Sequence, residues 1–314
     1  MKIFLKQTQL FLLFFAIAFS SLGVSFFYLN DYSLDDLPAP YLSNYFHFNE
    51  KMKFLRETDI EPVILVAGSS MGLANFHSKT LTERFGTDAH LNLSSQALTI
   101  EHLYPLLNIM NELYKPEMLI VSTNFYEFTN RHLLIDNELT ANYLKEEKLE
   151  FSYHLRRFNL KYYIDHIPRV HNRQKGKIPY YDRHGTINQA VRDIDLSEIE
   201  GEPLIHTQHN YRYNYLEKLA YFCSKEGIQL VIVQSPHRKR VFNNLSETEK
   251  EVYTRHIEQI ESILSAYGYL FINAQDKEWD DNLFTGSTHF NVNGAIKFTK
   301  FIADAINFET GNHF

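Results

Sequence analysis

Hydrophobic residues in this chain form one long run near the N-terminus and a series of short runs after residue 62. The long run is residues 10–29, LFLLFFAIAFSSLGVSFFYL, which holds 20 residues without a charge. A helix of that length crosses a bilayer hydrocarbon core of about 30 Å. The pattern predicts a transmembrane helix within residues 1–30.

The residues around this run predict its orientation. Lys2 and Lys6 precede it, and lysines on a short leading segment favour its cytoplasmic placement. A cleavable signal peptide is the alternative, because Ala16 and Ala18 have A-x-A spacing, but the apolar run continues past them. In either case the rest of the chain is exported, and we predict a single-pass cell-membrane protein with its domain on the extracytoplasmic side.

The short runs predict buried strands alternating with helices. Residues 63–67, 118–121 and 230–233 are apolar throughout, which is typical of strands covered on both faces. Segments between them have helical spacing, as in Leu103, Leu106, Leu107, Met110 and Leu113. This alternation predicts an α/β fold with a parallel sheet.

The same pattern divides the chain. Residues 31–61 have mixed polarity and predict a stalk that turns helical, and the domain proper extends from 62 to 314. An insertion at about 125–210 interrupts the alternation. From Phe151 to Gly185 it carries eight Lys and Arg against two acids, which fits a solvated helical hairpin, or a lid or acceptor-binding face for an anionic polymer or a lipid head group.

Composition narrows the classes of function. The net charge of −7 gives no basic footprint for nucleic acid. The single cysteine, Cys223, excludes an intramolecular disulfide and is interpreted as a buried thiol. There is no HExxH, P-loop or GxGxxG motif, and His47, His77, His90 and His102 have no acid or histidine at ligand spacing. We therefore predict no metal and no cofactor.

Candidate chemistry gathers where the predicted strands end. GSSMG, SSQA, STNF and QSPH each follow an apolar run, and ligands bind at the carboxyl ends of parallel strands. GSSMG also satisfies G-x-S-x-G, the nucleophile elbow of α/β-hydrolases, but that fold needs several strands before the serine. The loop SPHRKR, with Arg238, is interpreted as a solvated loop rather than a ligand site.

Four blocks in order resemble those of the SGNH (GDSL-type) hydrolases. They are GSSM (68–71), NLSSQA (92–97), STNF (122–125) and STHFNVNGA (287–295). The resemblance implies a three-layer α/β/α, flavodoxin-like domain, with Ser70 as nucleophile and His289 as its base. It also implies an oxyanion site formed by the Asn124 amide and the backbone N–H of Ser70, with Ala97 standing near the family's usual glycine.

The last block departs from the family, which has Asp three residues before the histidine where this chain has Gly286. A backbone carbonyl could orient the imidazole, Asp280 or Asp281 could substitute, or the site could be degenerate. Independently of the resemblance, Asn124 could cap a loop, His289 could lie on the surface, and Asn291 or Asn293 could cap the last helix.

The resemblance extends to membrane-anchored bacterial proteins such as those of alginate O-acetylation and D-alanyl transfer. It implies a serine esterase or O-acyltransferase acting on a cell-surface glycan or anionic polymer, with a multi-spanning membrane acyltransferase as partner. Arg156, Arg157 and Arg238 are the candidate substrate-binding residues. A non-catalytic glycan-binding or assembly protein on the same fold is the alternative.

Overall fold

The computed structural model covers the 314 residues and describes residues 2–129, 132–176, 180–187, 189–190, 205 and 211–311. The chain divides into two compact units. Unit 1 comprises Met1–Pro38 and Asn159–Ile178, and unit 2 comprises Ala39–Phe158 and Pro179–Phe314.

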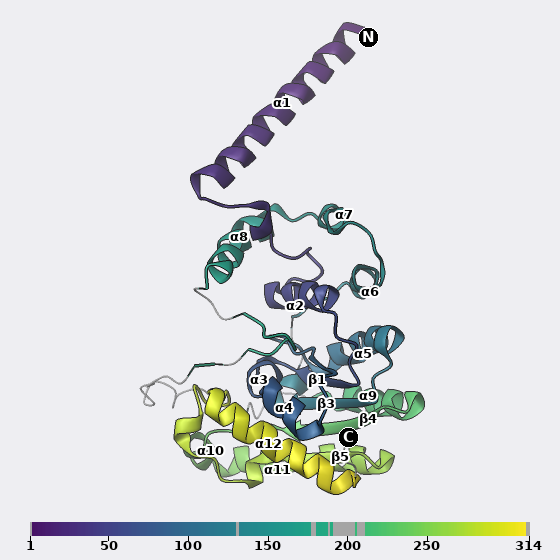
Figure 1. The fold of residues 1–314 in the computed structure, drawn as a ribbon, viewed down its shortest axis with the longest axis vertical. Coiled ribbons are helices and arrows are strands. Elements are labelled where there is room, and N and C mark those ends of the chain that lie inside the picture. Colours follow the sequence, from purple (N-terminus) through teal and green to yellow (C-terminus); the bar gives the residue numbers. More distant parts are fainter. Residues whose placement is uncertain are drawn as a thin grey trace. The chain divides into compact units, whose positions relative to one another are not determined.

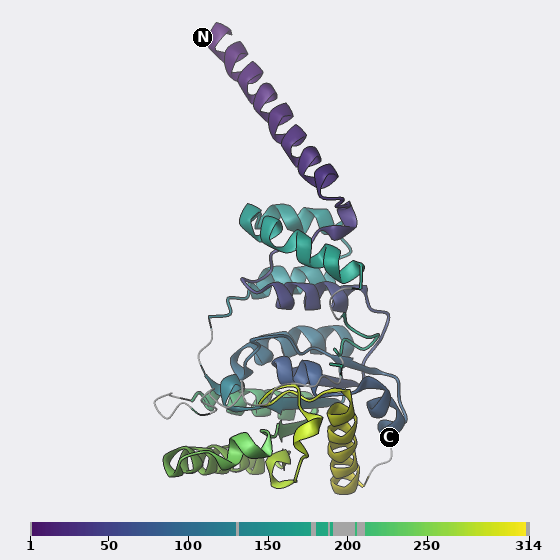
Figure 2. The ribbon, with the colours of Figure 1, turned by 90° about the vertical axis from the view of Figure 1, so that its left-hand side faces the viewer.

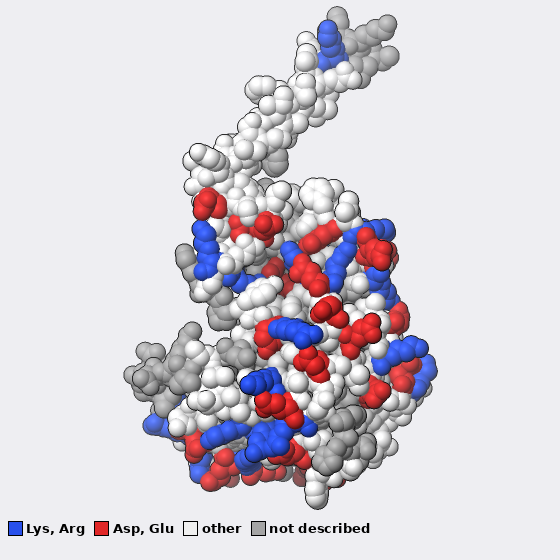
Figure 3. All heavy atoms as spheres, viewed as in Figure 1, with Lys and Arg blue, Asp and Glu red and all other residues white. Residues whose placement is uncertain are grey.

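Unit 1 contains the long N-terminal helix α1 (Lys2–Leu29). Its stretch Lys6–Leu29 is long and apolar enough to cross a membrane, as a signal sequence also is. In Figure 3 the described residues of this helix are white apart from a basic side chain near its N-terminus. The 3-10 helix η1 (Leu34–Asp36) and the helix α8 (Leu160–Gln174) also belong to this unit.

Unit 2 is built on a parallel sheet that, among the described residues, has five strands in the order β2-β1-β3-β4-β5. This is the flavodoxin-like order. The chain moves from β1 to β2 at one edge of the sheet and then from β3 to β5 towards the other edge, so the order in which strands are added reverses between β1 and β3. The strands are β1 (Ile64–Gly68), β2 (His90–Asn92), β3 (Met118–Thr123), β4 (Gln229–Gln234) and β5 (Leu270–Asn273). The predicted parallel α/β fold is confirmed.

Strands β1, β3 and β4 are apolar along most of their length, as expected of strands that helices cover on both faces. Leu65 and Ala67 of β1 face one core, and Ile64 and Val66 face the other. The resulting three layers can be followed in Figures 1 and 2. The first core is closed by α2 (Phe46–Glu57), α5 (Ile100–Tyr114), α9 (Asn214–Glu226) and α11 (Glu247–Tyr267), and the second by α4 (Ser78–Phe85) and α12 (Val292–Thr310).

Residues 39–61, part of the segment predicted as a stalk, belong to unit 2. Phe48, Met52 and Leu55 of α2 are buried in the first core. These side chains recur at helical spacing, so the segment contributes a packed helix to the domain.

The predicted insertion contributes helices and an extended strap. The helices are η2 (Phe125–Phe128), α6 (Asn137–Lys145), α7 (Glu150–Arg156) and α8, the last in unit 1. The strap, residues 180–187, runs along β2, where the N–H of Asn92 donates to the carbonyl of His184 at 2.8 Å. An edge strand presents unpaired backbone groups, and the strap covers part of this one.

The buried Lys51 of α2 fastens the strap. Its Nζ donates to the carbonyl oxygens of Asn92 and Gly185 and lies 3.9 Å from the centre of the Tyr181 ring. Burial lowers the pKa of this amine well below 10.5. The lysine therefore satisfies two backbone carbonyls inside the domain.

Replacing Lys51 with Met should destabilise unit 2. The methionine fills a similar volume but leaves both carbonyls without this donor, at a cost of about 2–4 kcal/mol in the free energy of unfolding. Urea denaturation measures the loss. Lys79→Met is the control, because Lys79 is exposed and paired with Glu83, and it should change stability by about 0.5 kcal/mol or less. Equal stability of the two variants would contradict the role of Lys51.

Candidate active site

Ser70 begins the short helix α3 (Ser70–Ala74), two residues after β1 ends. Gly68, the last residue of β1, has a φ of +146°, and a Cβ there would lie 2.4 Å from the carbonyl oxygen of Ser122 in β3. Only glycine permits that approach. The neighbouring Ser69 is the N-cap of α3 and accepts a hydrogen bond from the Met71 N–H at 3.4 Å, so the two serines of GSS have different roles.

His289 faces Ser70 across the carboxyl edge of the sheet. Its Nε2 lies 2.8 Å from Ser70 Oγ, which is hydrogen-bonding distance for a base and its nucleophile. The Thr288 hydroxyl lies 3.4 Å from Nδ1. The histidine precedes α12, whose N-cap Asn291 accepts from the Gly294 N–H at 3.1 Å, as one of the two predicted caps.

Asn75 holds the backbone on both sides of His289. This buried residue ends α3, and its Nδ2 donates to the Thr288 carbonyl at 3.0 Å while its Oδ1 accepts from the Phe290 N–H at 2.9 Å. One side chain thus ties the helix that starts with Ser70 to the peptide groups flanking the histidine. The relative position of nucleophile and base depends on it.

Asn124 follows β3 and is fully buried. Its Oδ1 accepts a hydrogen bond from the Phe125 N–H at 2.6 Å. This bond makes Asn124 a cap, as predicted, and it also sets the orientation of the amide. Its Nδ2 lies 3.0 Å from Nε2 of His237 and 3.6 Å from the sulfur of Met71, next to Ser70. With Oδ1 occupied, the NH2 group is the end of the amide directed to this part of the site.

His237 follows β4 and is 1% exposed. Burial lowers the pKa of its imidazole to about 4, so the ring is neutral near pH 7 and its Nε2 accepts from the Asn124 amide. The interpretation of SPHRKR as a solvated loop is wrong for its first part, because His237 and Arg238 are both buried. No motif in the sequence indicates this burial, because a histidine among basic residues is typical of a surface.

Ala97 adopts the conformation expected of a glycine. Its φ is +64°, in the left-handed region that costs a residue with a Cβ about 1–2 kcal/mol. The turn that holds it is closed by the Leu98 N–H donating to the Ser95 carbonyl at 3.2 Å. Strain of this kind persists where the surroundings fix the backbone, and here it occurs in the second of the four sequence blocks.

The remaining candidates have other contacts. Arg238 is 1% exposed and pairs with Asp281 at 3.2 Å, while Asp280 lies 4.0 Å from Lys297 at the surface. These contacts fix the η5 turn (Asp281–Leu283) beside the loop that carries His289. A Cβ added to Gly286, in the same loop, would meet no atom within 4 Å.

Arg156 and Arg157 lie at the end of α7. The guanidinium of Arg156 stacks on the Tyr153 ring at 4.9 Å, and that of Arg157 lies 5.2 Å from the Tyr41 ring and 3.4 Å from the Asp136 carboxylate. Both are exposed. No described contact joins either arginine to Ser70 or His289.

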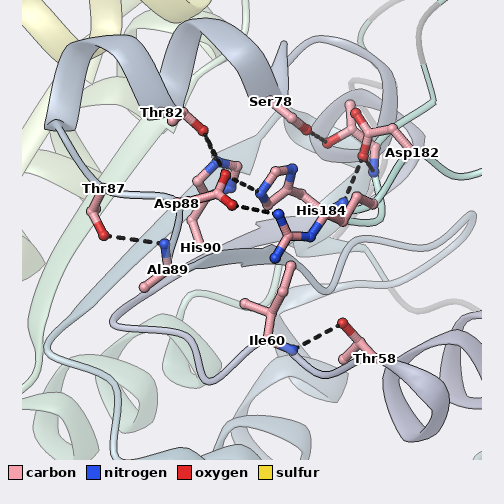
Figure 4. A network of polar contacts seen from close by, with 12 residues as sticks. Thr58, Ile60, Ser78, Thr82, Thr87, Asp88, Ala89, His90, Asp182 and His184 are labelled. Carbon is pink, nitrogen blue, oxygen red and sulfur yellow. Dashed lines mark hydrogen bonds and ion pairs between the residues drawn. The ribbon is translucent and has the colours of Figure 1, made fainter.

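The fold also brings Asp88, His90 and His184 together beside β2 (Figure 4), with ligand atoms within 4.8 Å of one another. His184 Nε2 bonds to Asp88 Oδ1 at 2.8 Å, and His90 Nε2 bonds to Thr82 Oγ1 at 3.0 Å. The two rings are stacked 4.0 Å apart with planes 18° from parallel, so their nitrogen lone pairs lie in nearly parallel planes, whereas the ligands of one ion converge on it. We interpret the cluster as a hydrogen-bonded network that holds the strap against β2.

Together these residues form an arrangement suited to acyl transfer. The hydroxyl of Ser70, after β1, faces a histidine base, and the amide of Asn124 follows the neighbouring strand β3. The strand order reverses between β1 and β3, which is where α/β sheets bind ligands. The four sequence blocks named Ser70, His289 and Asn124. They missed Asn75, which bonds to the peptide groups on either side of His289. His237, the last residue of the QSPH stretch, was not among the predicted site residues, although it bonds to Asn124.

Loss of the Asn75 amide should slow the reaction of Ser70 with a fluorophosphonate. Asn75→Ala removes both bonds to the loop of His289, and a displacement of about 1 Å costs on the order of 100-fold. Asn75→Asp keeps the acceptor for the Phe290 N–H and should lie between Ala and the unsubstituted chain. Asn108→Ala, which affects an exposed contact to Glu112, is the control, and labelling of Asn75→Ala at the control's rate would refute the role.

His237 should contribute to stability in a pH-dependent way. An unfolded histidine has a pKa near 6.5, and the folded value is about 4, so its contribution is complete above about pH 6.5 and is lost as the pH falls towards 4. At pH 5 the loss is about 2 kcal/mol. Urea denaturation of the unsubstituted chain and of His237→Gln at pH 7 and pH 5 tests this.

His237→Gln keeps an acceptor for the Asn124 amide but does not titrate, so it should retain Ser70 labelling and lose about 2 kcal/mol less stability than the unsubstituted chain between pH 7 and pH 5. His237→Leu should lose labelling. The exposed His132 changed to Gln is the control. An unaltered pH dependence in His237→Gln would show that His237 is not the titrating group.

Comparison with known proteins adds similarities at the level of structure. The sequence matches no model of a known protein family and no curated protein. Among solved structures, it is similar to a putative platelet activating factor from Streptococcus pneumonia, with 13% identity, a TM-score of 0.43, and coverage of 82% of this chain and 90% of that one.

Two further solved structures are bacterial esterases. EstA, a psychrotrophic esterase from Pseudoalteromonas sp., has 11% identity, a TM-score of 0.39 and coverage of 79% of this chain and 98% of that one. Est24, a carbohydrate acetylesterase from Sinorhizobium meliloti, has 10% identity, a TM-score of 0.35 and coverage of 78% and 98%. At this level of similarity a shared activity does not follow, and the chemistry of this chain has to be derived from its own residues.

Proposed function

We propose that this protein is a membrane-anchored serine esterase or O-acyltransferase that forms an acyl-enzyme on Ser70. The observation that carries the proposal is the 2.8 Å contact between Ser70 Oγ and His289 Nε2. The buried amide of Asn124 supports it, because a nucleophile, a base and an anion-stabilising donor are the minimum for acyl transfer.

The first half of the reaction acylates the serine. Ser70 Oγ attacks the carbonyl carbon of an ester while its proton passes to His289 Nε2. The negative charge that develops on the carbonyl oxygen is stabilised by Asn124 Nδ2 and by the backbone N–H groups of Ser70 and Ala97. Collapse of the tetrahedral intermediate breaks the bond to the leaving alcohol, which takes the proton from His289.

The second half repeats these steps with another nucleophile. The oxygen of water or of an acceptor hydroxyl attacks the acyl carbon while its proton passes to His289. The same donors stabilise the oxyanion. Ser70 then leaves with the proton returned by the imidazole. With water the outcome is hydrolysis, and with a sugar hydroxyl it is transfer of the acyl group.

Two positioning residues serve this chemistry. Asn75 sets the distance between nucleophile and base through the backbone on both sides of His289. His237 sets the orientation of the Asn124 amide through its neutral Nε2. Neither touches the reacting atoms, so each acts through the residue it holds.

The substrate belongs to the same proposal. The proposal takes α1 as a transmembrane helix with the domain on the extracytoplasmic side, and the length and apolar character of Lys6–Leu29 support it. The acceptor proposed for that side is a cell-surface glycan or anionic polymer, and the proposed source of the acyl group is a multi-spanning membrane acyltransferase. The exposed Arg156 and Arg157 are the polymer-binding candidates. The buried ion pair of Arg238 with Asp281 gives that arginine a structural role.

A second function is a non-catalytic glycan-binding or assembly protein on the same fold. Gly286 favours it, because the family resembled by the sequence blocks has an orienting Asp at that position. The two functions differ in the reactivity of Ser70, since a binding protein has no need of an activated hydroxyl.

A fluorophosphonate probe distinguishes the two. The full chain should be labelled, Ser70→Ala and His289→Asn should not, and Ser69→Ala should remain labelled because Ser69 is the helix cap. With an aryl ester as substrate, Ser70→Ala should lower kcat/KM by about 1000-fold or more. Absence of labelling in a folded, unsubstituted chain would support the binding protein and refute the enzyme.

A further inference from the structure

Polar side chains follow three neighbouring strands at the carboxyl edge of the sheet. Asn124 comes directly after β3, His237 is three residues beyond the end of β4, and Gln275 is two residues beyond the end of β5. The three strands are adjacent in the sheet order, so these residues leave the same edge next to one another. Gln275 belongs to none of the four sequence blocks, and its side chain contacts His237.

The side-chain amide of Gln275 binds both backbone groups of His237. Its Oε1 accepts from the His237 N–H at 2.6 Å, and its Nε2 donates to the His237 carbonyl at 3.4 Å. The backbone pairing of β4 with β5 ends at Gln234 and Asn273. A primary amide carries the same donor and acceptor as a peptide group, so Gln275 continues this pairing three residues beyond the end of β4.

The imidazole of His237 depends on this backbone support. Its Nε2 contacts the Asn124 amide at 3.0 Å, and among the described residues no group hydrogen-bonds to its Nδ1. The rings of Phe125 and Phe242 lie 6.4 and 6.2 Å from it, centre to centre. The one hydrogen bond of the imidazole is therefore with the amide that it orients, and the fixed point for both has to come from the His237 backbone.

Gln275 is presented by a turn that is itself well held. It lies in the 3-10 helix η4 (Ala274–Asp276), whose N-cap Asn273 accepts from the Gln275 N–H at 3.3 Å. The same Asn273 oxygen accepts from the Tyr253 hydroxyl at 2.9 Å, and the Trp279 indole N–H donates to a carbonyl of the turn at 2.8 Å. The backbone of Gln275 is thus fixed before its side chain reaches His237.

The peptide group that Gln275 binds also contacts the loop of the base. The N–H of Arg238, which shares a peptide group with the His237 carbonyl, donates to the Ser287 carbonyl at 2.8 Å. Ser287 lies two residues before His289. One peptide group therefore accepts from Gln275 on one side and donates to the loop that carries the base on the other.

We propose that Gln275 is a positioning residue of the active site, which holds the backbone of His237 and, through the imidazole, the Asn124 amide that stabilises the oxyanion. Gln275 touches no reacting atom. Its effect on the reaction rests on the proposed acyl transfer at Ser70, whereas its effect on the Asn124 amide is measurable without that reaction.

Gln275→Met tests the catalytic part, because methionine has a similar volume and makes neither hydrogen bond. With an aryl ester as substrate, kcat should fall by about 10- to 100-fold, since a displaced oxyanion donor loses the charge that develops in the transition state. KM should change by less than about threefold, because this contact is not made to the bound substrate. Gln275→Glu keeps an acceptor for the His237 N–H and should recover most of kcat.

Gln259→Met is the matched control, because Gln259 is exposed on α11, and it should leave kcat and KM unchanged. Urea denaturation checks that each variant is folded, and Gln275→Ala, which adds no bulk beside His237, is a second variant expected to behave like Gln275→Met. If Gln275 only closed the loop between β4 and β5, its loss would lower stability and leave the kcat of the folded protein at the control value. That result would overturn the proposal.

Nuclear magnetic resonance of the full chain with ¹⁵N-labelled asparagine separates this proposal from the proposed function. The side-chain signals of Asn124 are identified by their absence in Asn124→Ala, and they should shift in Gln275→Met but not in Gln259→Met. A shift without fluorophosphonate labelling of the unsubstituted chain would support the role of Gln275 and refute the enzyme. Labelling of the unsubstituted chain without a shift in Gln275→Met would refute the role of Gln275 alone, and absence of both would refute both.

Discussion

The close approach of β1 to β3 is the constraint on which the site depends. Gly68 pairs with Ser122 across these two strands, and any side chain at residue 68 would meet the Ser122 carbonyl. Because both strands run in the same direction, their carboxyl ends open at one edge, where the sheet order also reverses. Ser70 leaves one strand there and Asn124 leaves the other. The hydroxyl and the amide are neighbours because two backbones touch.

The base reaches this edge from the far end of the chain. Val63, just before β1, and Asn291, the N-cap of α12, are separated by most of the domain's sequence. In the fold, however, α12 packs beside α4 against the sheet face formed by Ile64 and Val66. The packing of the apolar face of α12 therefore determines where the preceding loop, which carries His289, lies relative to the sheet. Asn75 then sets the finer position of His289. Packing brings the loop near the serine, and two hydrogen bonds determine the contact.

Sequence patterns predicted the sheet, its parallel direction and three side chains of the candidate site, because uniformly apolar strands and short polar blocks at strand ends are local signals. They did not predict that α2 packs into the core, since its spacing is equally typical of a helical stalk. They missed Asn75 and His237 for another reason. A buried amide or imidazole is recognised by the groups around it, and these are distant in the chain. The partners of Asn75 lie 213 and 215 residues away, and those of His237 lie 113 and 38 residues away. The resemblance placed Ala97 near a position that is usually glycine, but a sequence does not give a backbone dihedral angle, and the φ of +64° comes from the structure.

The dual attachment of Asn75 has a consequence for how such a protein is made. A chain is synthesised from its N-terminus, so Ser70 is made 219 residues ahead of His289. Until the final helix folds back, the hydroxyl has no base and the loop has no anchor. A chain that lacks the residues from Gly286 onward therefore has Ser70 without the imidazole that faces it in the folded domain, and the contact between the two side chains forms only when α12 is in place.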